Sequence, residues 1–84
     1  MTQNTFRAGV YRHYKGRLYL VLGLSQHSET REMCVVYVPL YEHEGASINH
    51  RPIEMFTSYV KPPESESICQ RFTFVGFTPD TPNV

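Results

Sequence analysis

Residues Gly9 to Gly23 read GVYRHYKGRLYLVLG, a pattern that predicts a β-hairpin with a strongly marked turn. Tyr14-Lys15-Gly16 fits a three-residue hairpin loop whose third position needs a positive φ, which glycine adopts freely. A competing two-residue turn at Lys15-Gly16 would slip the pairing by one residue. We predict the first register, since it keeps His13 out of the aliphatic layer. It pairs His13 with Arg17, Arg12 with Leu18, Tyr11 with Tyr19, and Val10 with Leu20.

The predicted hairpin has two chemically different faces, because side chains alternate along a strand. One face is aliphatic and is expected to be the core, with Arg12 at its rim; it collects Val10, Leu18, Leu20 and Leu22. The other is aromatic and basic, and collects Tyr11, His13, Arg17, Tyr19 and Val21. The aromatic-basic face is therefore the candidate binding surface.

Composition bounds the class of protein. The 84 residues make one small domain, which buries only about 60–65% of its unfolded surface, so self-association into a homodimer would add burial. Eight Lys and Arg balance eight Asp and Glu, which argues against a strongly basic nucleic-acid binder but leaves local patches open. No signal peptide and no membrane-spanning run is expected, and two cysteines are too few for a disulfide scaffold. A cytoplasmic protein with reduced thiols is expected.

Further strands are indicated downstream of the hairpin. A β-rich run over 32–41 should end near Pro39, and shorter strands are expected at 48–50, 58–61 and 71–77. Arg51 to Phe56 reads as a single helical or 3₁₀ turn that places Ile53 and Phe56 in the core. The loop at 62–67 is polar and proline-rich.

These elements predict an all-β fold of about five strands with one short 3₁₀ turn. We expect a small SH3-like barrel or a strongly bent antiparallel sheet, since short strands in so small a chain favour a curled arrangement. The chain is expected to be one domain over 1–84, with an ordered core over 9–77 and flexible tails at 1–8 and 78–84.

Ordered motifs along the chain carry a resemblance to a known family. They are G-x-Y-x-H-Y-K-G and Y-x-V-L-G in the hairpin, H-S-E-T at His27 to Thr30, and R-P-x-x-M-F at Arg51 to Phe56. This pattern resembles a family of small bacterial proteins described as a domain of unknown function. The chain departs from it at Asn49-His50 and over 57–70. The resemblance implies a small β-rich domain and supplies no activity.

Several reactive residue types are present without a catalytic or metal-binding pattern. The four histidines and two cysteines form no C-x₂-C or H-x₃₋₅-H pair, so neither a metal nor a cofactor is predicted. Cys34 lies in an apolar strand and is expected to be a buried, inert thiol. The H-S-E-T segment cannot form a triad from neighbours in sequence, and is expected to be a hydrogen-bonded loop in which Ser28 or Thr30 satisfies backbone groups.

We predict a non-catalytic binding module whose ligand is a nucleic acid, a nucleotide or a protein partner. The candidate binding residues are Tyr11, His13, Tyr14, Lys15, Arg17, Tyr19, His27, Glu29, Thr30 and Arg51. Aromatic rings can stack on bases or other planar groups, and an arginine can bind an anion through two hydrogen bonds. Two alternatives remain open: the same side chains serve only cross-strand packing, or the chain is a small enzyme or an enzyme's accessory subunit that uses His13, His27 and Glu29.

Overall fold

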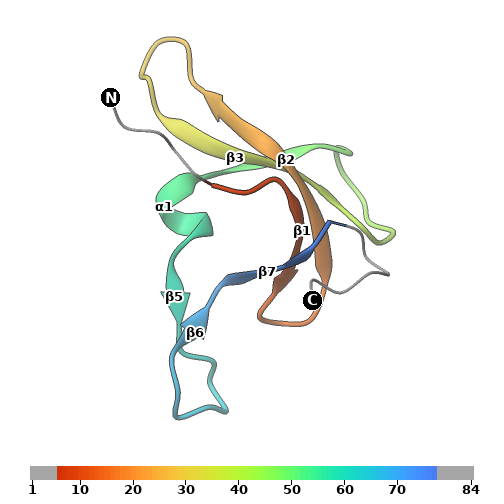
Figure 1. The fold of residues 1–84 in the computed structure, drawn as a ribbon, viewed down its shortest axis with the longest axis vertical. Helices are drawn as coiled ribbons and strands as arrows, with labels where there is room; N and C mark the ends of the chain where they lie inside the picture. The colour runs from red at the N-terminus through yellow and green to blue at the C-terminus, as the bar shows by residue number, and fades with distance from the viewer. Residues whose placement is uncertain (1–5, 78–84) are drawn as a thin grey trace.

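The computed structural model describes residues 6–77 and consists of one bent antiparallel sheet with a projecting two-stranded ribbon (Figure 1). The sheet order is β4-β3-β2-β1-β7, with β1 at Gly9–His13, β2 at Leu18–Gln26, β3 at Met33–Pro39, β4 at Asn49–Pro52 and β7 at Phe72–Gly76. The ribbon pairs β5, Tyr59–Val60, with β6, Cys69–Gln70. The predicted strands are therefore present, and β3 ends at the predicted proline.

The hairpin has the predicted three-residue loop and register. Tyr11 pairs with Tyr19 and Val10 with Leu20, and the His13 N–H donates to the Arg17 carbonyl at 2.8 Å. Gly16 adopts a φ of 109°, which explains why glycine closes this loop.

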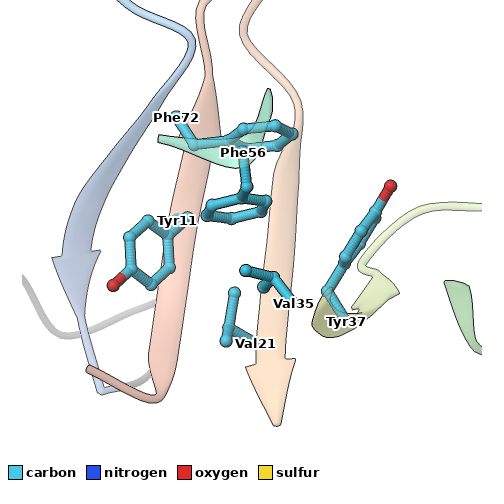
Figure 2. Close-up of a cluster of buried hydrophobic side chains, with 6 residues drawn as sticks. All are labelled: Tyr11, Val21, Val35, Tyr37, Phe56 and Phe72. Atoms are coloured by element: carbon cyan, nitrogen blue, oxygen red, sulfur yellow. The ribbon is translucent and has the colours of Figure 1, made fainter. Parts of the chain in front are cut away.

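The main core cluster lies on the aromatic side of the hairpin, so the prediction of an aliphatic core face was wrong except at Val10, which is fully buried. The main cluster contains Tyr11, Val21, Val35, Tyr37, Phe56 and Phe72 (Figure 2). Leu22, on the expected core face, is 51% exposed, and Leu18 and Leu20 are only half-buried. Aromatic rings bury more apolar area than the leucines do, which favours the observed side.

A β-bulge explains how β2 joins this core after Val21. The pairing of β2 with β3 shifts between Val21 and Gly23, so Leu22 is left over on the exposed side. Leu24 then regains the face of Val21 and packs against the core cluster. Strict alternation along β2 does not predict this change of face.

One short helix closes the open side of the sheet. Helix α1, Ile53–Phe56, is the single turn predicted for this segment. Of the two forms expected it is α-helical and not 3₁₀, because the Thr57 N–H donates to the Ile53 carbonyl four residues back at 3.0 Å. A helix this short is unstable alone, so packing must hold it. Phe56 is 1% exposed and Ile53 packs beside the cluster, as predicted.

A closed SH3-like barrel is not confirmed. Strands β4 and β7 stand at the two ends of the sheet order, and no pairing between them joins the sheet into a barrel within residues 6–77. The bulges in β1–β7 and β2–β3 bend the sheet instead.

The expected tails overlap only partly with the described residues. Residues 1–5 and 78–84 lie outside them. Within the expected N-terminal tail, Phe6 stacks on Tyr11 with ring centroids 5.5 Å apart, and the Arg7 carbonyl accepts the Tyr11 hydroxyl hydrogen bond at 2.8 Å. This part of the chain therefore packs against the core.

Replacing Gly9 with alanine should destabilise the fold. A Cβ at Gly9 would lie 2.8 Å from both the Gly76 carbonyl oxygen and a Phe74 ring atom, at a φ of 140°. We expect Gly9→Ala to lower the free energy of unfolding by about 1–3 kcal/mol, measured by urea denaturation.

The matched control for this substitution is Gly45→Ala. Gly45 also has a positive φ, of 97°, but a Cβ added there would meet no neighbouring atom within 4 Å. Equal losses in the two variants would show that backbone strain, and not the close approach of β1 to β7, makes glycine necessary at position 9.

Candidate binding surface at the hairpin end

The aromatic core continues to the surface at the end of the molecule that carries the β1–β2 turn. Phe72 is 4% exposed and its ring contacts those of His13 at 4.9 Å and Tyr19 at 5.5 Å between centroids. We call this region the hairpin-end surface; it comprises His13, Tyr14, Lys15, Arg17, Tyr19, Tyr41, Arg51 and Arg71. Its rings are thus attached directly to the core.

Arg51 is held in place by four features of its surroundings. It precedes Pro52, which restricts its backbone to the extended region, and it pairs with Val35 in the sheet. Its Nε donates to the Tyr37 hydroxyl at 3.3 Å, and its guanidinium carbon lies 5.4 Å from the centre of the Phe72 ring. Figure 2 shows the Tyr37 hydroxyl pointing away from the buried cluster. Arg51 is therefore oriented by contacts on its Nε side.

Two tyrosines and an arginine form a second part of the surface. The Tyr19 and Tyr41 hydroxyls are hydrogen-bonded at 2.7 Å, and the Arg17 guanidinium lies over the Tyr41 ring at 4.5 Å. Burial and the hydrogen bond with Tyr41 raise the pKa of Tyr19 to about 12, so its hydroxyl keeps its proton at neutral pH. This stack holds Arg17 close to the protein surface at the loop.

His13 is surrounded by positive charge. Burial lowers the pKa of its imidazole, and Arg51, Arg71 and Lys15 lower it further by repelling the imidazolium charge. Its Nδ1 accepts the Lys15 N–H at 3.1 Å, and its ring lies 4.5 Å from the Tyr14 ring. Arg71 reaches the same place because the Tyr14 N–H donates to its carbonyl at 2.9 Å. These effects favour the neutral form of His13, and the Lys15 N–H on Nδ1 favours the tautomer with its proton on Nε2.

The cations of this surface have no carboxylate partner. Over residues 6–77 no ion pair joins Lys15, Arg17, Arg51 or Arg71 to an acidic side chain. No Asp or Glu precedes Glu29 in the sequence, so the hairpin contributes only positive charge. A chain with no net charge therefore carries a local positive surface.

The structure brings together only some of the predicted site residues. His13, Tyr14, Lys15, Arg17, Tyr19 and Arg51 share the hairpin-end surface. Tyr11 is 7% exposed and belongs to the core, where it cannot stack on a ligand without rearrangement. Tyr41 and Arg71 were missed, because neither is near the hairpin in sequence and only strand pairing places them there.

His27, Glu29 and Thr30 lie at the opposite end of the molecule. They form the β2–β3 loop, which Figure 1 shows far from the β1–β2 turn. The nine-residue β2 between the two loops spans about 30 Å. His13 therefore does not meet His27 or Glu29, and the three do not form a catalytic group in this structure.

The His27–Thr30 loop has a clear structural role. The His27 Nδ1 accepts the Glu29 and Thr30 N–H groups at 3.2 and 3.3 Å, and the Thr30 Oγ1 accepts the Glu32 N–H at 3.2 Å. The last contact agrees with the expectation that Thr30 satisfies a backbone group. The imidazole replaces a missing backbone acceptor in the turn.

Other reactive groups do not add a site. Cys34 is buried as predicted, and its burial raises the pKa of its thiol. The part of the chain from Phe6 to Phe77 holds no group of three or more His, Cys, Asp or Glu side chains able to bind a metal ion. No helix among the described residues is long and apolar enough to cross a membrane.

The fold and surface define a small all-β domain with an aromatic-basic end and no convergent catalytic group in its described part. The family model for proteins of unknown function termed DUF1653 matches residues 9–74. The chain belongs to this family.

A solved relative supports the same assignment. A DUF1653 protein from Bordetella bronchiseptica is 40% identical to this chain, and its crystal structure superimposes with a TM-score of 0.81. The match covers 94% of this chain and 96% of that one. No match is found among curated proteins.

Substitution of His13 should weaken the pH dependence of stability. The pKa of His13 is lower in the folded than in the unfolded chain, so the unfolded state binds more protons as pH falls through the ordinary histidine range. The contribution of His13 to the free energy of unfolding is therefore complete above about pH 6.5 and is lost as pH falls below it. We expect His13→Gln to lose less stability than wild type between pH 7.5 and 5.5 in urea denaturation.

Arg12→Gln is the control for this experiment, because Arg12 is exposed on the same strand. It should keep the wild-type dependence on pH. If His13→Gln lost as much stability as wild type between pH 7.5 and 5.5, the predicted role of His13 would be contradicted.

Replacing His27 should loosen the β2–β3 loop without affecting the hairpin-end surface. We expect His27→Ala to lower the free energy of unfolding by about 1–2 kcal/mol, since two loop N–H groups lose their acceptor. Amide hydrogen exchange should accelerate at Glu29 and Thr30. Unchanged exchange there, with the exposed His50→Ala variant as control, would show that the imidazole does not order the loop.

Proposed function

We propose that this domain is a non-catalytic binding module that takes single-stranded nucleic acid at the hairpin-end surface. The observation that carries the proposal is the gathering of four cations around aromatic rings. These cations are Lys15, Arg17, Arg51 and Arg71, and none pairs with a carboxylate within residues 6–77. Sequence-tolerant binding of single strands combines these two features, since phosphates need positive charge and bases need flat rings.

The available rings differ in how free they are. Tyr19 packs against the rings of Tyr37 and Phe72, so its face is committed to the protein. Tyr14 is half-buried and lies at the loop beside Lys15, whose ammonium is 5.9 Å from its ring centre. The His13 ring lies 4.5 Å from the Tyr14 ring on one side, so we assign the other side of Tyr14 to stacking on a base.

The balanced composition of the chain is compatible with this proposal. The hairpin carries no acidic side chain, and Glu29, the first one in the sequence, lies in the loop at the opposite end of the molecule. The carboxylates next to the surface are Glu42 and Glu44, which follow Tyr41, and Glu54, which lines a pocket with Arg71. A small number of phosphate contacts is expected, with an affinity that falls as salt rises.

A protein partner was the other ligand considered from the sequence. The hairpin-end surface favours nucleic acid, because its own charged side chains are all basic and none of them pairs with a carboxylate within residues 6–77. An acidic protein partner would show the same salt dependence but would not need a free ring at Tyr14.

The test is an amide chemical-shift titration with short single-stranded DNA and RNA. Shifts should be confined to His13–Arg17, Tyr41, Arg51 and Arg71, and absent from His27–Thr30. For three phosphate contacts, the logarithm of the affinity should fall with that of the salt concentration with a slope of about −2. Tyr14→Ala should weaken binding roughly tenfold with little loss of stability.

The matched control is Tyr59→Ala, at a tyrosine that is 65% exposed on the projecting ribbon. It should bind like wild type. The absence of shifts at low salt would overturn the proposal, and shifts centred on the His27–Thr30 loop would place the site at the wrong end of the molecule.

A further inference from the structure

The hydrogen-bonding groups of Arg51 that face away from Tyr37 are without acceptors. Its Nε is used by the Tyr37 hydroxyl, and its guanidinium plane lies near the Phe72 ring. No hydrogen bond to either Nη is found among the described residues. A guanidinium that is fixed on one edge and free on the other can bind an anion through two parallel hydrogen bonds.

His13 adds a second free donor at the same place. Its Nδ1 is occupied by the Lys15 N–H, which leaves Nε2 as the protonated nitrogen. Nε2 has no partner in residues 6–77. The His13 ring and the Arg51 guanidinium lie 4.9 and 5.4 Å from the centre of the Phe72 ring. The same buried side chain therefore positions both donors.

Arg71 and Lys15 complete the charge around this point. The Arg71 Nε is held by the Ser58 hydroxyl at 2.9 Å, which again leaves its Nη groups without a protein acceptor in the described chain. The Arg71 backbone is hydrogen-bonded to Tyr14, Lys15 follows Tyr14 directly, and both cations lower the pKa of His13, so both act electrostatically at this point. Lys15, Arg51 and Arg71 carry three positive charges, and His13 can accept a further proton. A phosphodiester carries only one negative charge, so it would leave most of this positive charge unbalanced.

We infer that Arg51, Arg71, Lys15 and His13 form a subsite for a terminal phosphate monoester, with the adjoining nucleoside stacked on Tyr14. The inference rests on the proposed function and refines it, because it assigns the module to the end of a strand and not to its interior. A monoester carries up to two negative charges against one for a diester, so it matches this concentration of cations better. Binding the dianion also favours a proton on His13.

The first experiment compares oligonucleotides that differ only at their ends. Fluorescence anisotropy measures the affinity for one sequence with a 5′-phosphate, a 3′-phosphate or hydroxyls at both ends. We expect a terminal phosphate to tighten binding about tenfold. In Arg51→Gln this ratio should fall to about one, while Arg12→Gln, which removes an exposed cation from the same hairpin, should keep it.

The second experiment needs neither a nucleic acid nor a variant. The His13 ring protons are titrated by NMR with and without inorganic phosphate at constant ionic strength. Phosphate should raise the His13 pKa and leave the titration of His27, at the other end of the molecule, unchanged. A His13 titration that does not respond to phosphate would overturn the subsite.

The two experiments separate this inference from the proposed function. Equal affinity for phosphorylated and unphosphorylated strands, with no effect of phosphate on His13, would overturn the phosphate subsite and leave nucleic-acid binding in place. A rise in the His13 pKa without binding of any oligonucleotide would support the subsite and overturn nucleic-acid binding.

Discussion

The stacking of Phe56 on Phe72 joins the short helix to the edge of the sheet. The two rings are parallel within 4°, with centroids 4.0 Å apart, and both are almost fully buried. Phe56 belongs to a helical turn too short to be stable alone, and Phe72 belongs to an edge strand of the sheet. Their contact therefore fixes the helix against the open side of the bent sheet and fixes β7 against β1.

The same contact sets the position of the hairpin-end surface. Phe72 has the Phe56 ring on one face, and its remaining surroundings include the rings of His13 and Tyr19 and the guanidinium of Arg51. Residues from β1, β2 and β4 are thus positioned by one side chain from β7. A small domain can hold charged groups in a fixed arrangement in this way, because the rigidity comes from aromatic packing beneath them.

The two loops at the ends of β2 use their histidines differently. The β2–β3 loop uses its histidine internally, where the imidazole accepts two backbone N–H groups. The β1–β2 loop uses only one nitrogen of its histidine in that way and leaves cations nearby without carboxylates. This difference in how the polar groups are used, more than the presence of histidine, distinguishes a structural loop from a candidate binding site.

The local elements could be predicted from the sequence. Gly16 marked the loop and hence the register, Pro39 marked the end of β3, and the spacing of Ile53 and Phe56 indicated a helical turn against the core, because each depends on backbone preferences of adjacent residues. Most of the hairpin-end residues could also be found in this way, since the hairpin concentrates them.

Tertiary structure alone decided which side of the hairpin is the core and which residues share the site. The bulge at Leu22 and the helix that brings Phe56 to the aromatic face depend on packing that no alternating pattern encodes. Strand pairing brings Tyr41 and Arg71 to the loop, and the length of β2 keeps His27 away from it. These outcomes follow from contacts between residues distant in sequence, so the assembled sheet was needed to reveal them.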